Sequence, residues 1–375
     1  MWFHPPTAHT PDGEGFWVVS RHADALAAAG DGEAFSSEGG GERAAGGTLI
    51  EDLPAGFAAG VLLNMMDDPR HQQIRRVVTP SVSARALARM EPELRARTDG
   101  LVGAMADAGE CDFVGVVATE LPLQATAQLL GVPQADRHDL FRWATATLDY
   151  DDRDLGEHSA KTQEAAASMR EYGLRLLEQK RREGGDDILS AVAHAEIAVT
   201  DLELEMFFNL LMAAGSETTR NTIAVGLTAL MDRPEQWRAL QADRSLLPSA
   251  TEEILRWASS TTYNRRTATR DVELGGHAIA AGDKVTLWWA SANRDEDVFD
   301  DPFEFDIRRD PNPHVTFGHG SHFCLGANLA RLEIRLVFDA LLDTYASIEP
   351  AGPIEWTRSN KHSGVRRMPV RAVRR

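Results

Sequence analysis

The sequence contains few cysteines and no long apolar segment. Only Cys111 and Cys324 occur among 375 residues, and they lie far apart. Neither a disulfide framework nor a Cys-X-X-Cys metal or redox site is therefore expected. No apolar run reaches the roughly 18 residues of a membrane-spanning helix, and the N-terminal residues lack the apolar centre of a signal peptide. These absences predict a cytoplasmic protein without a membrane anchor.

Basic residues are also outnumbered by acidic ones. The formal net charge is −18, which argues against non-specific binding to nucleic acid, because such binding requires basic surface. Hydrophobic residues make up 43% of the chain and charged residues 26%, as in ordinary globular proteins. We expect one large domain over residues 1–375.

Helical patterns dominate residues 68–256. The stretch Met90–Gly109 has apolar residues at three- and four-residue spacing and ends in glycine. The stretch Asp201–Pro234 is apolar along most of its length, which predicts a helix that crosses the core, with Asp201 as its N-cap. Strands are expected at Phe16–Ser20 and, around glycine turns, within Thr267–Ala290. The chain is therefore predicted to be mainly α.

One cysteine lies where a long loop meets a helix. Residues 298–323 carry three prolines and are predicted to form a loop, and an amphipathic helix follows. Cys324 lies at this junction, where the unpaired N–H groups of a helix start are expected to lower the thiol pKa and favour the thiolate. A thiolate is a nucleophile or a metal ligand.

Three interpretations of Cys324 follow from its surroundings. A nucleophile would use His319 or His322 as its base. A single axial ligand to haem iron fits the flanking glycines, which would let a flat group approach the backbone. The third interpretation, an inert cysteine, is the usual one for an isolated residue. A structural zinc site is excluded because no second cysteine is near.

The wider sequence resembles the cytochrome P-450 family. "FGHGSHFCLG" (Phe317–Gly326) matches every fixed position of the family's haem-binding loop, F-G-x-G-x-H-x-C-x-G. "AAGSETTR" is similar to its oxygen-activation motif, "EILR" to its E-x-x-R motif, and "DDPRHQQIRR" to a stretch that contacts the haem propionates. The resemblance extends from about Phe16 almost to the C-terminus and is strongest to bacterial members that oxidise sterols and methyl-branched lipids.

This resemblance implies a fold, a cofactor and a set of site residues. The implied fold is the family's triangular helical prism with a small β-rich lobe. The cofactor is haem b, with Cys324 as the axial iron ligand and O2 as co-substrate. Implied haem contacts are His71, Arg75, Arg266, His322, Phe317, Gly318, Gly326 and Ala214. Glu217 and Thr218 would deliver protons, next to a local opening of the helix at Gly215. Glu253, Arg256 and Arg309 would form a buried structural trio, with Arg308 as the alternative to Arg309.

Two features depart from the resembling proteins. The N-terminal segment is shorter than in the family, so part of the rim of the substrate entrance is expected to be built differently. Polar residues stand where the lipid-oxidising members are usually apolar, and because buried polar groups need partners, they predict a polar, aromatic or amide-containing metabolite, with an acidic group near Lys361. These residues are Thr261, Thr262, Asn264, Lys361 and His362.

The expected activity is that of a monooxygenase supplied with two electrons by a ferredoxin or flavodoxin-type partner and its reductase. Natural-product oxidation is the main expectation. Sterol or branched-lipid hydroxylation and radical coupling are alternatives within the same chemistry. A haem sensor or carrier without turnover is an alternative of another class, and the Glu217–Thr218 pair argues against it.

Overall fold

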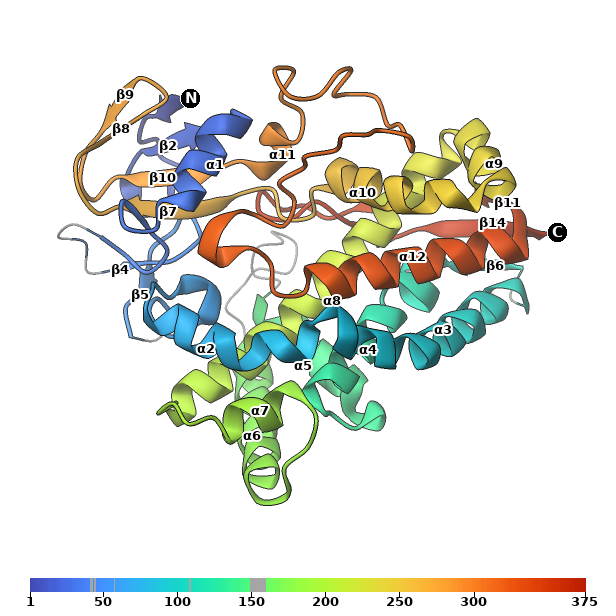
Figure 1. Cartoon of the computed structure of the whole chain (residues 1–375), viewed down its shortest axis with the longest axis horizontal. Helices are drawn as coiled ribbons and strands as arrows, with labels where there is room; N and C mark the ends of the chain where they lie inside the picture. The colour runs from blue at the N-terminus through green and yellow to red at the C-terminus, as the bar shows by residue number, and fades with distance from the viewer. Residues whose placement is uncertain (41–42, 44, 57, 108, 149–159) are drawn as a thin grey trace.

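A computed structural model describes residues 1–40, 43, 45–56, 58–107, 109–148 and 160–375. Helices form most of the molecule, and two groups of strands lie at its opposite ends (Figure 1). The mainly α fold with a small β-rich lobe is thus confirmed. The helices are α1 (His22–Gly30), α2 (Arg70–Val78), α3 (Ala84–Asp107), α4 (Glu120–Leu130), α5 (Arg137–Leu148), α6 (Ala160–Glu183), α7 (Ile188–Ala193), α8 (Asp201–Met231), α9 (Pro234–Ala242), α10 (Leu247–Ala258), α11 (Trp289–Ala292) and α12 (Ala327–Thr344).

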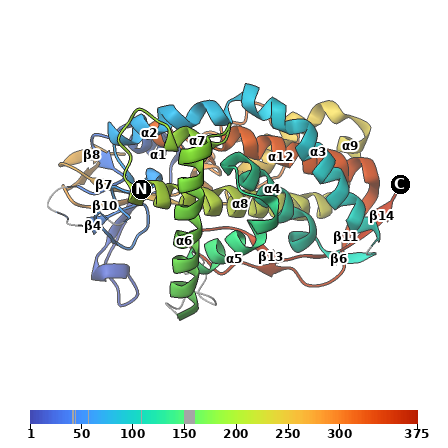
Figure 2. The ribbon, with the colours of Figure 1, turned by 90° about the horizontal axis from the view of Figure 1, so that it is seen from below.

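Helix α8 crosses the core, as its apolar sequence predicts. Most of its 31 residues are buried, and it contacts α4, α5, α6, α10 and α12. Figure 2 shows α6 crossing it.

The N-cap of α8 is Thr200 and not Asp201. The Thr200 hydroxyl accepts the Glu203 N–H at 3.1 Å, and the Glu203 carboxylate accepts the Thr200 N–H at 2.8 Å, which satisfies two otherwise unpaired donors.

The larger sheet lies at the N-terminal end of the molecule. Its five strands follow the order β1-β2-β10-β7-β3, and β2 and β10 run parallel. The expected glycine turns are present at Gly275 and Gly282, whose φ angles are +55° and +87°. The strands at this end are β1 (Trp2–His4), β2 (Phe16–Val19), β3 (Phe35–Ser36), β4 (Ala45–Gly46), β5 (Leu53–Pro54), β7 (Asn264–Ala268), β8 (Val272–Leu274), β9 (His277–Ile279) and β10 (Lys284–Leu287).

A second group of strands was not expected from the sequence. The strand order β11-β14-β6 joins the C-terminus to the end of α3 (Figure 1). These strands are short and mix charged with apolar residues, so no alternating pattern marks them. Their bounds are β6 (Glu110–Asp112), β11 (Tyr345–Pro350), β12 (Glu355–Trp356), β13 (Val365–Arg367) and β14 (Pro369–Arg374).

The loop of residues 298–323 is present as predicted, apart from a short 3-10 turn at Gly320–His322. Three residues separate its end from Ala327, where α12 begins. Its last residues, the middle of α8 and the segment between α10 and β7 surround one cavity. Over the described ranges, no helix combines the length and apolarity needed to cross a bilayer.

Candidate active site at Cys324

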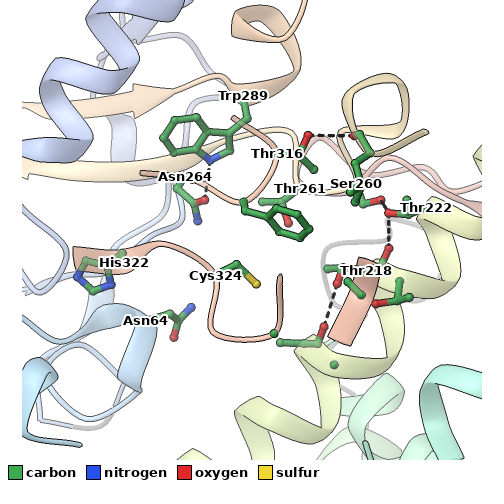
Figure 3. Close-up of a pocket in the computed structure, with 18 of the residues that line it drawn as sticks. Asn64, Thr218, Thr222, Ser260, Thr261, Asn264, Trp289, Thr316, His322 and Cys324 are labelled. Carbon is green, nitrogen blue, oxygen red and sulfur yellow. Dashed lines mark hydrogen bonds between the residues drawn. The ribbon is translucent and has the colours of Figure 1, made fainter. Parts of the chain in front are cut away.

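The cavity has a volume of about 260 Å³. The Cys324 sulfur points into it, and Thr218 of α8 lies on another side (Figure 3). The structure brings ten residues selected from the sequence to its lining: Ala214, Thr218, Thr261, Asn264, Arg266, Phe317, Gly318, His322, Cys324 and Gly326. Six others do not line it: His71, Arg75, Glu217, Thr262, Lys361 and His362.

The loop around Cys324 folds back on itself. The Cys324 N–H donates to the Phe317 carbonyl at 2.9 Å, and Gly318 in between has φ +70°. The glycines have different roles. A side chain at Gly320 would lie 2.5 Å from the Ala29 carbonyl, so this glycine allows the loop to contact α1. A side chain at Gly326 would meet no atom within 4 Å, and one at Gly318 would meet only the His322 carbonyl at 3.9 Å, so these two glycines fit the expected role of leaving space beside the sulfur.

The pKa of Cys324 differs from expectation. Burial raises the pKa of its thiol, although the Gly326 N–H and the charges of Arg75 and Arg331 oppose this shift. Cys324 has accessible surface and lines the cavity, and many protein atoms surround its sulfur. Desolvation of the thiolate therefore outweighs the helix start. A positive partner inside the cavity is needed to make the thiolate the stable form.

A charged cluster missed by sequence reasoning holds the loop against α10 and α12. Arg331 donates to both oxygens of Glu252 at 2.8 Å, and His314 Nε2 lies 3.0 Å from the same carboxylate. Burial opposes ionisation, yet the hydrogen bonds from His314 and Arg331 lower the pKa of Glu252 to about 2. The Arg331 guanidinium also stacks over the Phe317 ring at 4.6 Å. The cluster therefore fixes Phe317, whose carbonyl holds Cys324.

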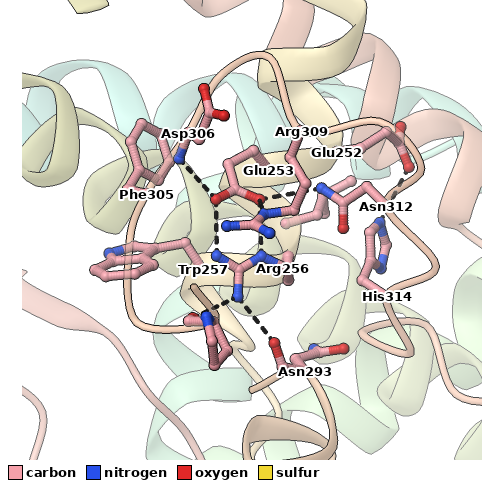
Figure 4. A network of polar contacts seen from close by, with 12 residues as sticks. Glu252, Glu253, Arg256, Trp257, Asn293, Phe305, Asp306, Arg309, Asn312 and His314 are labelled. Atoms are coloured by element: carbon pink, nitrogen blue, oxygen red, sulfur yellow. Dashed lines mark hydrogen bonds and ion pairs between the residues drawn. The ribbon is translucent and has the colours of Figure 1, made fainter. Parts of the chain in front are cut away.

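The expected trio of Glu253, Arg256 and Arg309 lies together (Figure 4). Two Glu253–Arg256 hydrogen bonds of 2.7 Å join side chains that are fully buried. Arg309 Nε lies 3.2 Å from the Glu253 carboxylate, whereas Arg308 is exposed. Arg256 also donates to the carbonyls of Asn293, Pro302 and Glu304, all from the segment that leads to the loop or from the loop itself. This contact pattern ties α10 to that segment.

Cations and imidazoles gather at one edge of the cavity. The His71 and His322 rings stack with centroids 4.1 Å apart, and His71 lies behind His322. Burial lowers both pKa values, that of His322 to about 2, so both rings are neutral. Burial also lowers the pKa of Arg266 to about 10. In the described part of the chain, its guanidinium makes one hydrogen bond, to the Arg265 carbonyl at 2.9 Å, and no ion pair.

Arg75 belongs to the same edge. Burial is the main cause that lowers its pKa, while Cys324 is close enough to raise it. Its guanidinium has no hydrogen-bond partner among the residues that the structure describes. Arg266 is thus a buried cation and Arg75 a half-buried one, and neither forms an ion pair with a carboxylate of the described residues, a costly arrangement unless an anion is bound.

Helix α8 supplies hydroxyl groups to the cavity and is not opened there. Thr218 donates to the Ala214 carbonyl at 2.9 Å, and all residues from Asp201 to Met231 are helical. A side chain at Gly215 would lie 2.6 Å from the Thr126 hydroxyl, so this glycine allows α4 to approach. Glu217 does not line the cavity, and its carboxylate lies 3.6 Å from the Arg220 guanidinium.

The second polar wall differs from prediction. Thr261 and Asn264 line the cavity, and Asn264 accepts the Trp289 indole N–H at 2.8 Å. Thr262 instead donates to the Asn360 and Lys361 carbonyls. Lys361 is 5% exposed, and its ammonium donates to the carbonyls of Thr48 and Tyr263 at 3.1 and 2.8 Å. It therefore neither faces a substrate acid nor extends to solvent.

His362 is held in the same backbone arrangement. It forms an isolated antiparallel bridge with Thr261 and donates its N–H to the Ser359 hydroxyl at 3.1 Å. Of the polar residues selected here, Thr261 and Asn264 line the cavity, whereas Thr262, Lys361 and His362 do not. The sequence did not show which polar groups hold the backbone and which reach the cavity.

Glu333 is the most unusual of the cavity residues that were not selected from the sequence. Glu333 of α12 is 1% exposed, and neither carboxylate oxygen has a hydrogen-bond partner within the described part of the chain. Burial raises its pKa well above the ordinary carboxyl value, so the side chain is neutral. Helical spacing offered a signal, because Glu333 falls on the same stripe as the buried Leu329, Leu336 and Val337.

These features fit haem. A thiol faces the cavity, Gly326 leaves space beside it, and the guanidinium groups of the half-buried Arg75 and the buried Arg266 provide charges that two propionates would balance. The neutral His322 adds a donor or acceptor at the same edge. A haem iron would also supply the positive partner that the Cys324 thiolate needs.

Comparison with known proteins agrees with this fit. Residues 123–369 match the family model "Cytochrome P450". A putative cytochrome P450 126 from Mycobacterium tuberculosis is 48% identical over 99% of this chain and 90% of its own. A methyl-branched lipid omega-hydroxylase from the same organism is 39% identical over 97% and 86%. A Mycobacterium marinum cytochrome P450 in complex with pseudoionone has a TM-score of 0.90 and 37% identity, covering 98% and 90%. The chain therefore belongs to the cytochrome P450 family and is a haem-thiolate monooxygenase that uses O2.

Proposed function

We propose that Cys324 is the axial ligand of the haem iron and that Arg75, Arg266, His71 and His322 hold the propionate edge. The observation that carries this proposal is the Cys324 sulfur facing a cavity that is lined by the buried Arg266, with the half-buried Arg75 close to His322 and Cys324 and neither arginine in an ion pair among the described residues. Phe317, Gly318, Gly326 and Ala214 would contact the macrocycle. When bound, the haem activates O2 with two electrons and supplies the oxidising chemistry.

The first prediction tests the axial ligand. Reduced protein exposed to CO should show the red-shifted Soret band of thiolate ligation, and Cys324→Ser should lose it, because a serine hydroxyl is a much weaker ligand than a thiolate. Cys111→Ser is the matched control, since Cys111 lies in β6 away from the cavity. A Cys324→Ser protein that kept the band, or a Cys111→Ser protein that lost it, would refute the assignment.

Thr218 and Glu217 are proposed to deliver protons in different ways. Thr218 lines the cavity and holds a lone pair toward it, because its proton bonds the Ala214 carbonyl. Glu217 directly precedes Thr218 in α8, lies 3.6 Å from Arg220 and does not line the cavity, so its proposed role is to supply protons from outside the cavity. Thr218 is thus the group that orients a proton donor inside the cavity.

The second prediction concerns coupling. Thr218→Ala should bind haem and substrate normally but release a larger share of electrons as hydrogen peroxide, because protons are no longer positioned at the reaction site. The ratio of product formed to NAD(P)H consumed measures this, with Thr228→Ala as the control. Thr228 lies further along α8, outside the cavity, and donates to the Ala224 carbonyl in the same way. Equal coupling in wild type and Thr218→Ala would remove Thr218 from the proposal.

For the substrate, we propose an organic molecule with an apolar body and at least one polar group. Leu255, Trp289 and Leu329 provide apolar surface, whereas Ser260 and Thr261 provide hydroxyls. This balance favours a natural product over a purely hydrocarbon chain. The lipid-hydroxylase alternative keeps support from the 39% identical relative.

A spectral titration with both ligand classes, followed by product mass analysis, separates these alternatives. Gain of one oxygen atom indicates hydroxylation, whereas loss of two hydrogen atoms without oxygen gain indicates coupling through a radical. The ferredoxin or flavodoxin-type donor and the cytoplasmic location remain predictions from the sequence, and reconstitution with each donor type tests the first.

A further inference from the structure

The hydroxyl protons of α8 at the cavity are directed into the helix. Thr218 donates to the Ala214 carbonyl at 2.9 Å, and Thr222 donates to the Thr218 carbonyl at 2.8 Å. A carbonyl oxygen has no proton to give, so the threonine is the donor in both bonds. Each hydroxyl carries a single proton. Both oxygens therefore keep only lone pairs for any other partner.

Ser260 extends this arrangement from the segment after α10. Its Oγ lies 2.6 Å from Thr222 Oγ1 (Figure 3). Because the Thr222 proton is already used, Ser260 is the donor in this bond. Both side chains line the cavity, and only 2% of Ser260 and 3% of Thr222 is exposed. We call Thr218, Thr222 and Ser260 the acceptor wall, because all three protons are used within the protein.

Other polar groups of the cavity do not share this constraint. The hydroxyls of Thr219 and Thr261 have no hydrogen-bond partner within the described ranges, so they can rotate to donate or accept. Asn264 is constrained in the opposite sense. Its carbonyl oxygen accepts the Trp289 N–H at 2.8 Å, so its amide N–H groups are the ones left for another partner. The fixed acceptors and the fixed donor thus come from different elements, and in Figure 3 they lie on different sides of Cys324.

We infer that the substrate carries a hydroxyl or N–H donor that faces Ser260 and Thr222. A carbonyl or ether at this place would meet lone pairs and leave its own acceptor unpaired, which is unfavourable in a buried site. This inference rests on the proposed function and deepens it by naming the group that the acceptor wall recognises. It does not depend on the overall size or ring content of the substrate.

The test uses three probes with one carbon skeleton: farnesol, which donates, farnesyl methyl ether, which does not, and farnesal, which only accepts. Equilibrium dialysis against the haem-loaded protein measures affinity whether or not the Soret band moves. Wild type should bind farnesol about three- to tenfold more tightly than either other probe, the range of one net hydrogen bond. Equal affinities for the three probes would overturn the inference.

A substitution of Thr222 gives a sharper test. Thr222→Val keeps the shape but removes the oxygen that accepts the Ser260 proton, so Ser260 becomes a donor toward the cavity. The preference for farnesol should then be lost or reversed, with farnesal bound at least as tightly as farnesol, because Ser260 can now donate to an acceptor. Thr222→Ser should restore the wild-type order. If Thr222→Val does not fold, Thr222→Ala removes the same oxygen and should give the same change.

The control is Thr228→Val, which removes a comparable hydroxyl of α8 outside the cavity and should keep the wild-type order. An unchanged order in Thr222→Val and Thr222→Ala would overturn the inference, as would a reversal in Thr228→Val. Haem content and the CO band of every variant are measured in parallel. Loss of the thiolate band in wild type would refute the proposed function, whereas a normal band with unchanged probe order would refute only the acceptor wall.

Discussion

Two buried glutamates, one in the network that anchors the loop before Cys324 and one beside the cavity, have opposite surroundings. Glu253 accepts hydrogen bonds from Arg256, from the Asp306 N–H at 2.9 Å and from Asn312 at 3.1 Å (Figure 4). Glu333 is as deeply buried, yet neither of its oxygens has a partner among the residues that the structure describes. Glu253 thus has the partners that a buried carboxylate needs, whereas burial without a partner raises the pKa of Glu333 well above the ordinary carboxyl value.

The same contrast separates the cations. Arg256 donates hydrogen bonds to backbone carbonyls and to the Glu253 carboxylate, and Lys361 donates to backbone carbonyls. Arg75 is half-buried and Arg266 is buried, and neither has an ion-pair partner among the described residues. Fully satisfied groups hold the fold, whereas unsatisfied ones mark the place where a ligand must supply the missing partner.

The largest expected effect comes from breaking the satisfied network. Glu253→Gln should lower the free energy of unfolding of the haem-loaded protein by about 3–5 kcal/mol, because it leaves Arg256 as a buried charge without its counter-ion. Urea unfolding followed by circular dichroism measures this, with haem content as a second readout. Glu91→Gln is the control, since Glu91 pairs with Arg95 at 3.4 Å on the surface, and it should cost less than about 1 kcal/mol. Similar losses in both variants would contradict the comparison.

The sequence predicted one side of this comparison better than the other. The Cys324 loop, the crossing helix α8 and the Glu253–Arg256 pair all follow from short motifs or helical spacing, in which residues near in sequence define the feature. The partners of Lys361 do not. Its ammonium bonds the Thr48 carbonyl, more than three hundred positions away, and no local pattern encodes that contact. The role of Gly320 likewise depends on Ala29, which only the folded chain brings close.

An intermediate effect is expected at Lys361. Lys361→Met should lower the free energy of unfolding by about 1–3 kcal/mol, because the carbonyls of Thr48 and Tyr263 lose their donor. The affinity ratio between a carboxylate ligand and its amide should not change, because the ammonium does not face the cavity. Arg367→Met, at an exposed residue paired with Glu355 at 3.4 Å, is the surface control. A selective loss of carboxylate binding in Lys361→Met would return this lysine to the substrate site.

The smallest effect should appear at Glu333, and only as a dependence on pH. Its pKa in the folded protein lies above the value in the unfolded chain, so the folded state holds the proton over the range between them. Stability from this group is therefore complete at pH values below the ordinary carboxyl pKa and is lost as pH rises toward the raised value. Glu333→Gln mimics the neutral acid and cannot titrate, so its stability should fall less steeply across this range and match or exceed that of wild type at neutral pH.

Glu205→Gln is a graded control. Burial also raises the pKa of Glu205, but Arg170 opposes the shift from 3.5 Å, so the slope of stability against pH should change less in this variant. Urea unfolding at a series of pH values measures the slopes. If Glu333→Gln followed the wild-type curve, the carboxylate would have a partner in the haem-loaded protein, and the contrast with Glu253 would fail at this residue.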